Sequence, residues 1–246
     1  MRYVEYGTQN HDTVILLHGG GLSWWNYREV AQLLADKYHV VLPILDGHAD
    51  SEHSFVSIEE NAARLIAYID KRHGGSICAL GGLSLGGQVA VEILTQRPDV
   101  CRFALLESTL VKPSKLTHAL IKPTFGMSYG LIKQKWFAKM QAAYLGIPRK
   151  LFDDYYRDTC KISKEDMIAF LESNSAYSIK PALQNTNAKV HIGFGGKEQA
   201  AIRLSAKMLN QTIPNSTAES IPGYRHGDLS INHPAQYAQM ILQLVS

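Results

Sequence analysis

Gly82-Leu83-Ser84-Leu85-Gly86 is the stretch that decides the fold of this 246-residue chain. The apolar run at 76–80 before it predicts a buried strand, and the run at 88–94 after it predicts a helix. A serine between glycines, where a strand turns sharply into a helix, is typical of a nucleophile lifted clear of a sheet. A β-carbon at either glycine would collide with the neighbouring strand or helix. We therefore predict that Ser84 is a nucleophile and that the N–H of Leu85 faces a developing oxyanion.

A second glycine-rich turn lies upstream. The apolar residues 13–17 predict a short strand, which runs into His18-Gly19-Gly20-Gly21. Glycines let backbone N–H groups approach a substrate carbonyl closely, so we predict Gly20 and Leu85 as the two oxyanion-hole donors. We expect His18 to orient this turn through hydrogen bonds and to take no part in chemistry.

A candidate general base lies near the other end of the sequence. Residues 217–221 predict the last strand, and Tyr224-Arg225-His226-Gly227-Asp228 follows it. A histidine on a loop after the last strand can reach over the serine turn, which favours His226. His233 is the alternative, but it directly precedes Pro234 at a predicted helix start, where a structural role is expected.

The acid that would orient this histidine has two candidates. Glu198 follows the predicted strand 190–194, and Glu107 follows the predicted strand 102–106. A carboxylate there would hold the imidazole in the right tautomer and stabilise the imidazolium. The alternative role for either is a solvated carboxylate near a helix start. We favour Glu198 and keep Glu107 open.

These motifs, together with Asp46-Gly47-His48-Ala49-Asp50-Ser51, resemble the α/β-hydrolase superfamily, in particular its esterase- and lipase-like serine members with a helical cap. The order Ser84, Glu198, His226 is similar to the family's order of serine, acid and histidine. The family's usual acid is aspartate, and here only the strand at 3–6 precedes the strand at 13–17. The resemblance implies an α/β-hydrolase core at 1–109 and 188–246, with a helical cap insertion at 110–187.

The hydrophobic periodicity predicts an α/β fold with a mostly parallel sheet flanked by helices. Ligands in such sheets bind at the carboxyl ends of the strands, where the candidate residues fall. The predicted helices span 25–37, 58–73, 87–96, 200–209 and 234–245, and further strands span 39–45 and 77–83.

The insert at 110–187 is predicted to be helical and rich in aromatic residues, with its clearest helices at 131–145, 151–159 and 164–174. In the predicted helix 131–145, Trp136 and Phe137 share an apolar face that also includes Lys133. We expect this face either to bind substrate, with Lys133 meeting an acidic group, or to pack into the insert's own core.

Charge is distributed unevenly. The insert holds 12 Lys and Arg against six Asp and Glu, and no acidic residue lies between Ser108 and Phe152. Three interpretations remain open: steering of an anionic substrate, contact with an acidic surface, or a solvated exterior. No motif accompanies the charge that would predict nucleic-acid binding.

The sequence predicts neither a metal nor a cofactor. Asp46, His48, Asp50 and His53 alternate in one loop, but the leading histidine and the adjacent Asp-His pair of a metallo-β-lactamase pattern are missing. The three cysteines, Cys78, Cys101 and Cys160, show no metal spacing and are expected to be reduced, which predicts a cytoplasmic location. We expect no membrane span or signal peptide, and the oligomeric state stays open.

The predicted function is a serine hydrolase that cleaves a small carboxylic ester, thioester or related acyl compound through an acyl-enzyme. One alternative is a carbon–carbon bond hydrolase or lyase that uses the same three residues. A second is a ligand-binding sensor that turns over slowly. Turnover of p-nitrophenyl esters separates the sensor from the enzymes.

Overall fold

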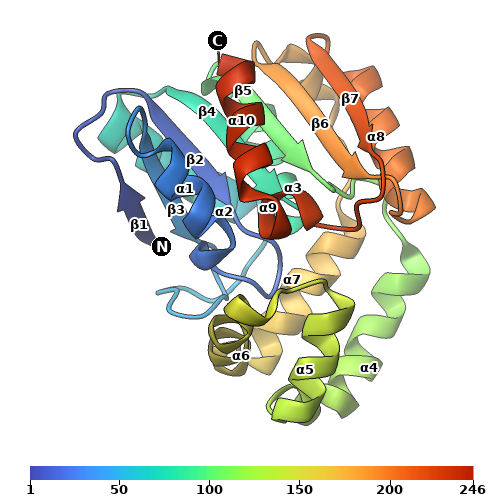
Figure 1. Ribbon diagram of the computed structural model, residues 1–246. Helices are drawn as coiled ribbons and strands as arrows, with labels where there is room; N and C mark the ends of the chain where they lie inside the picture. The colour runs from blue at the N-terminus through green and yellow to red at the C-terminus, as the bar shows by residue number, and fades with distance from the viewer. Residues whose placement is uncertain (246) are drawn as a thin grey trace.

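A single seven-stranded sheet organises the computed structural model, which describes residues 1–245 (Figure 1). The strands lie in the order β1-β3-β2-β4-β5-β6-β7; only β1 is antiparallel to its neighbour, and the rest are parallel. The fold class is therefore the predicted one. The strands are β1 (Arg2–Tyr6), β2 (Thr13–Leu17), β3 (His39–Ile44), β4 (Ile77–Leu83), β5 (Cys101–Glu107), β6 (Lys189–Gly195) and β7 (Ser216–Ile221).

Helices cover both faces of this sheet, so its central strands are mostly buried. All five residues of β2 are buried. A hydrophobic core lies on each face of the sheet. Successive β2 side chains pack into the two cores alternately, because successive residues of a strand point to opposite faces. One core includes α1 (Arg28–Leu34) and α10 (Pro234–Val245), and the other includes α2 (Ile58–His73), α3 (Leu85–Gln96) and α8 (Ala200–Thr212).

Helix α2 shows how local sequence sets the ends of an element. The Ser57 hydroxyl accepts a hydrogen bond from Glu60 N at 3.0 Å and so caps the first turn. Acidic residues lie in the first turn and basic residues in the last, which complements the helix dipole. Gly74, with φ 64°, ends the helix in the left-handed conformation. The predicted range 58–73 is confirmed.

The sheet topology places the two glycine-rich turns side by side. Helix α1 follows β2 on one face of the sheet, whereas α3 follows β4 on the other. The strands β2 and β4 are neighbours, with Leu17 paired to Gly82. Connections that leave neighbouring parallel strands toward opposite faces open a crevice at their carboxyl ends.

Four helices between β5 and β6 lie against this carboxyl edge, at the bottom of Figure 1. All four fall within the predicted insert 110–187, and the division of the chain at its ends stays a prediction. The helices are α4 (Lys115–Ile132), α5 (Lys135–Tyr144), α6 (Phe152–Lys161) and α7 (Lys164–Ala176).

The prediction of one helix at 131–145 is wrong. The chain leaves the helical conformation at Gln134, with φ −88° and ψ 123°, between α4 and α5. The Lys133 carbonyl, freed at this break, accepts a hydrogen bond from the Tyr156 hydroxyl at 2.8 Å. Helix α4 itself was not predicted, because Pro123, Gly126 and Gly130 are poor helix formers within it.

One further helix prediction needs correction, and one short helix was missed. The predicted helix 25–37 begins as a 3-10 turn, Trp24–Tyr27, and its α-helical part ends at Leu34. The short helix α9 (Asp228–Asn232) was not predicted, since five residues are too few for a hydrophobic period to be seen.

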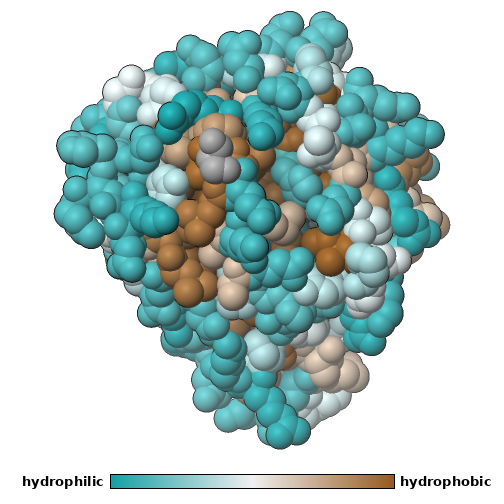
Figure 2. Space-filling view, turned by 45° about the horizontal axis from the view of Figure 1, so that its top comes forward, coloured by the Kyte–Doolittle hydropathy of each residue, from teal (hydrophilic) through white to brown (hydrophobic). Residues whose placement is uncertain are grey.

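Hydrophilic residues cover most of the face in Figure 2, around smaller hydrophobic areas. Within residues 1–245, no helix combines the length and the apolar character that crossing a bilayer requires.

Candidate active site

Ser84 occupies the turn between β4 and α3 in a strained backbone conformation, with φ 53° and ψ −110°. A β-carbon on Gly86 would overlap the carbonyl oxygen of Leu17, and one on Gly82 would overlap the backbone of Gly86. The glycines are therefore required by close backbone approach, as the sequence predicts. Ser84 N donates to the Glu107 carbonyl at 2.9 Å, which ties the turn to β5.

His226 and Glu198 are hydrogen-bonded to each other. The distance between His226 Nδ1 and Glu198 Oε2 is 2.9 Å. The Glu198 side chain is 1% exposed and the His226 ring 44% exposed. Burial raises the pKa of Glu198, but the hydrogen bond and charge of His226 outweigh it and leave that pKa below its usual value. An ionised carboxylate can only accept, so in the neutral imidazole Nδ1 carries the proton and Nε2 presents a lone pair.

Two further groups hold Glu198 in place. The Ser108 hydroxyl donates to Glu198 Oε1 in a short hydrogen bond, and Gly195 N donates to the same oxygen at 3.4 Å. Ser108 has a positive φ of 51° directly after β5. Sequence reasoning missed Ser108, because a single serine after a strand carries no distinguishing signal.

Glu107 has a different role from Glu198. Its Oε1 accepts from Leu229 N at 3.1 Å and from Ser230 N at 3.2 Å, at the start of α9. Burial raises the pKa of Glu107 to about 7. The rival histidine, His233, stacks on Tyr224 with ring centroids 4.4 Å apart. The structure thus brings Glu198, and not Glu107, within hydrogen-bond distance of His226.

The glycine turn at 18–21 is held by a buried, neutral His18. Its Nε2 accepts from Leu45 N at 3.1 Å, so Nδ1 carries the proton and donates to the Gly19 carbonyl at 2.9 Å. Burial lowers the pKa of His18 to about 3. His18 therefore orients the turn.

Gly20 and Leu85, the predicted oxyanion donors, line the same cavity as Ser84. Within residues 1–245, neither of their backbone N–H groups donates to another protein group. Both donors are therefore available to an atom in the cavity.

A second buried histidine, His48, also holds this turn. Its Nε2 accepts from Gly21 N at 3.1 Å, and its ring stacks on Phe170 of α7 with centroids 4.7 Å apart. Burial lowers the pKa of His48 to about 4, so the ring is neutral. Sequence reasoning weighed His48 only as a metal ligand and missed this contact, because Gly21 lies 27 residues away along the chain.

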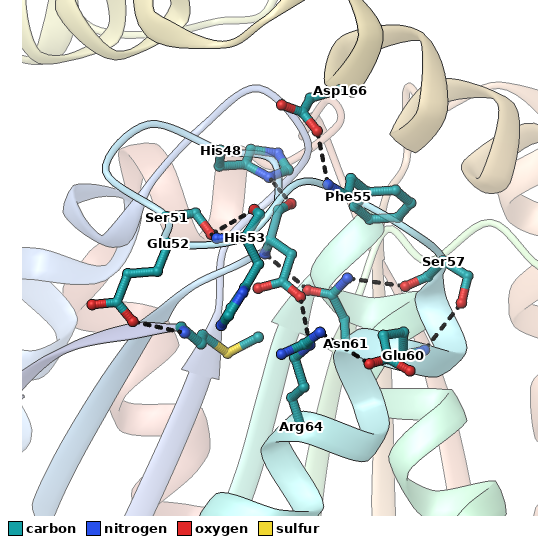
Figure 3. Close-up of polar contacts among 12 residues, drawn as sticks. His48, Ser51, Glu52, His53, Phe55, Ser57, Glu60, Asn61, Arg64 and Asp166 are labelled. Carbon is teal, nitrogen blue, oxygen red and sulfur yellow. Dashed lines mark hydrogen bonds and ion pairs between the residues drawn. The ribbon is translucent and has the colours of Figure 1, made fainter.

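The loop that carries His48 is fixed by its own polar contacts (Figure 3). Asp46 is fully buried and pairs with Arg64 at 3.1 Å, and Phe55 N donates to Asp166 of α7 at 2.7 Å. Asp50 pairs with Lys161 at 3.0 Å. Asp46, His48 and Asp50 therefore have separate partners, and no group arranged to hold a metal is found among residues 1–245.

A cavity of about 180 Å³ lies between the serine turn, the glycine turn and His226. Its polar side chains are Ser84, His226 and Asn174, and no Lys, Arg, Asp or Glu of the described chain lines it. The insert supplies Leu145, Ile147, Phe170, Leu171 and Asn174, and the core supplies Gly19, Gly20, Leu22, Leu83, Ser84, Leu85, His226, Gly227 and Ile231.

Asn174 is held by the helix that follows the serine. Its Nδ2 donates to Gln88 Oε1 and Gln88 Nε2 donates to its carbonyl, both at 2.9 Å. Gln88 is fully buried, and its own N–H donates to the Ser84 carbonyl at 2.9 Å. This pair connects α7 to the serine turn.

The predicted substrate-binding residues of the insert do not line the cavity. Lys133 lies at the end of α4, with Nζ 5.3 Å from the Tyr129 ring centroid. Trp136 is 61% exposed, and Phe137 is partly buried against one of the cores. The break at Gln134 takes Lys133 out of the helix that carries Trp136 and Phe137, so the predicted common arc is wrong.

Comparisons with known proteins agree with this architecture. A family model described as "Alpha/beta hydrolase family" matches residues 14–240. The uncharacterized hydrolase YugF of Bacillus subtilis is 27% identical over 89% of this chain and 85% of its own length. An AB hydrolase superfamily protein of Gibberella zeae is 31% identical, over 54% of this chain and 46% of its own length. This chain thus matches only about half of that relative.

Solved structures share the fold at lower identity. An enol-lactonase from Burkholderia xenovorans has a TM-score of 0.83 at 16% identity, covering 99% of this chain and 95% of its own. A thermophilic esterase from Thermogutta terrifontis has a TM-score of 0.79 at 19% identity, covering 98% of this chain and 91% of its own.

Proposed function

This chain belongs to the alpha/beta hydrolase family and is a hydrolase, and from that premise we propose that it cleaves a small carboxylic ester or thioester through Ser84, His226 and Glu198. The observation that carries the proposal is the 2.9 Å hydrogen bond between His226 Nδ1 and Glu198, beside a cavity that both Ser84 and His226 line. In the neutral imidazole this hydrogen bond keeps the proton on Nδ1 and leaves Nε2 free to accept one, which is what a general base needs.

In the proposed reaction, His226 Nε2 takes the proton of the Ser84 hydroxyl as its oxygen attacks the substrate carbonyl carbon. The carbonyl oxygen becomes an oxyanion, which the N–H groups of Gly20 and Leu85 stabilise. His226 then protonates the leaving alcohol or thiol. Water, deprotonated by the same histidine, releases the acid and restores the serine.

The cavity favours a small, uncharged acyl group. Its volume of about 180 Å³ lies below the range of roughly 300–1,000 Å³ that is typical of drug-sized ligands. Phe170, Leu171 and Ile147 offer apolar contacts, and the absence of a lining cation among the described residues gives an anionic acyl group no partner. Thus the proposed substrate is neutral around the scissile bond.

The test is the Ser84→Ala variant with p-nitrophenyl acetate and butyrate. We expect kcat to fall by about 10⁴-fold or more, because the covalent route is lost. Labelling of the wild-type protein by a fluorophosphonate should disappear as well. Labelling that persists in Ser84→Ala, or wild-type protein without esterase or thioesterase turnover, would contradict the proposal.

A further inference from the structure

Large hydrophobic side chains are exposed mainly on one part of the molecule. Eleven such residues are exposed within residues 1–245, and eight of them lie between positions 116 and 145, on α4, α5 and the residue just after α5. Isolated exposed hydrophobic residues are ordinary, whereas a concentration of them marks an interaction surface. The eight are Leu116, Leu120, Met127, Leu131, Trp136, Met140, Tyr144 and Leu145.

These side chains follow helical spacing. The four on α4 are separated by four, seven and four positions, so they form one stripe along the helix. On α5, Trp136, Met140 and Tyr144 are each four positions apart and form a second stripe. Helix α4 buries only Ile121 and Ile132 of its 18 residues, although it is apolar overall. Its outer stripe therefore has no cover from the described chain.

Exposed lysines lie on or directly beside the same two helices. Within residues 1–245, Lys112, Lys115, Lys133, Lys135 and Lys139 are exposed and have no carboxylate partner at ion-pair distance. Lys135 and Lys139 each directly precede a residue of the α5 stripe. No acidic residue occurs between Ser108 and Phe152, so the charged side chains of α4 and α5 themselves are all basic.

We propose that the α4–α5 surface, defined by the eight exposed hydrophobic residues and these five lysines, docks on a bilayer that contains anionic lipids. Apolar side chains mixed with lysines suit the boundary between headgroups and acyl chains, where tryptophan and tyrosine are also favoured. The lysine ammonium groups complement anionic headgroups. Since neither helix is able to span a bilayer, both lie along its surface.

This docking would connect the membrane to the cavity. Leu145 belongs to the α4–α5 surface and also lines the cavity that contains Ser84. A docked molecule would therefore hold the cavity beside the lipid phase, within reach of apolar esters dissolved there. The docking itself is independent of the proposed catalytic function.

The experiment measures co-sedimentation of the Ser84→Ala protein with vesicles of phosphatidylcholine alone or of phosphatidylcholine and phosphatidylglycerol at a 7:3 ratio. We expect binding to the anionic vesicles, weakened by 0.5 M NaCl because salt screens the lysines. Since the serine is absent, binding does not depend on catalysis, and a failure of the proposed function leaves this result unchanged.

Surface variants locate the binding. Replacing Lys133, Lys135 and Lys139 by Gln should lower the partition coefficient by about fivefold per lysine. Replacing Met127 and Trp136 by Ser should lower it by about tenfold or more through lost apolar burial. Lys207→Gln and Val56→Ser, exposed elsewhere, serve as matched controls and should bind as the parent does.

Circular dichroism and thermal melting verify that each variant is folded before binding is compared. No vesicle binding by the parent, equal binding to neutral and anionic vesicles, or binding that the surface variants retain would overturn the proposal. Binding to polyglutamate in place of anionic vesicles would also overturn it, in favour of an acidic protein partner.

Discussion

Two buried carboxylates near His226 differ in what surrounds them. Glu198 accepts hydrogen bonds from His226 and Ser108, so its charged form is stabilised despite burial. Glu107 accepts the backbone N–H groups of Leu229 and Ser230 on one oxygen, its other oxygen has no hydrogen-bond partner within residues 1–245, and burial raises its pKa to about 7. At the residue scale, the proposed catalytic acid is therefore the carboxylate that remains ionised.

The first prediction compares the two carboxylates. Glu198→Gln should lower kcat/KM at least about tenfold more than Glu107→Gln, because only Glu198 contacts the imidazole. Steady-state hydrolysis of p-nitrophenyl butyrate measures this ratio, with thermal melting to exclude unfolding. The reverse ranking would move the orienting role to Glu107.

The second prediction concerns pH. Burial lowers the pKa of His226, but the hydrogen bond and charge of Glu198 outweigh it, so the pKa lies above the ordinary 6.5. A base must be neutral to accept the serine proton, so kcat/KM should fall with acidification at a midpoint above pH 6.5. In Glu198→Gln the midpoint should move to lower pH. An unmoved midpoint would show that another group controls the acid limb.

At the scale of elements, the glycine turn after β2 depends on two histidines from different directions. His18 ties it to the end of β3 through Leu45 N, and His48 ties it to the following loop through Gly21 N. Phe170 of α7 stacks on His48, so the insert also contacts one of the two histidines that hold the glycine turn. The orientation of the Gly20 N–H therefore depends on packing among three elements.

The third prediction tests this support. His48→Ala leaves Gly21 N without its acceptor, so kcat should fall by about tenfold or more, with a smaller change in KM. His48→Gln should restore part of kcat, because an amide oxygen can accept the same hydrogen bond. His53→Ala, an exposed position on the same loop, is the control. Equal losses in His48→Ala and His53→Ala would refute a positioning role.

At the scale of the whole molecule, buried polar contacts join the insert to the sheet and its helices. Trp25 Nε1 donates to Asp158 of α6 at 2.9 Å, and Arg28 pairs with Asp154 at 2.8 Å. Both Trp25 and Asp158 are almost fully buried. The insert is thus held over the cavity by specific contacts as well as by apolar packing.

The fourth prediction follows from that contact. Trp25→Phe removes one donor to the buried Asp158 carboxylate, which keeps its hydrogen bonds from the Arg157 guanidinium, so the free energy of unfolding should fall by about 1–3 kcal/mol. Urea denaturation measures it, and Trp24→Phe, the neighbouring and less buried tryptophan, is the control. A loss in Trp24→Phe as large as that in Trp25→Phe would show that the hydrogen bond is not the cause.

Local sequence was sufficient for the fold class and for the strand–turn–helix around Ser84, and it supplied the candidates Ser84, His226 and Glu198, whose roles stay predictions. Buried strands appear in the sequence as apolar runs, and Gly82 is required by overlap with the backbone of Gly86, four positions away; Gly86 is required by the neighbouring strand β2, which the order of the sheet places beside it. The position of His226 after the last strand and of Glu198 after the one before follows from the parallel order of the sheet. The apolar runs and glycine positions are local features of the sequence, and the parallel direction of the strands follows from their alternation with helices, so all of them can be predicted from the sequence.

Tertiary packing alone decided which carboxylate contacts His226, how His48 supports the glycine turn and which insert residues line the cavity. Each depends on atoms far apart in sequence: Glu198 and His226 are 28 positions apart, and Gln88 and Asn174 are 86 apart. The misplaced helix at 131–145 has the same origin, since its break at Gln134 is stabilised by Tyr156 from α6. Hydrophobic periodicity indicates that a helix has a buried side, but the elements packed around it determine what that side contacts.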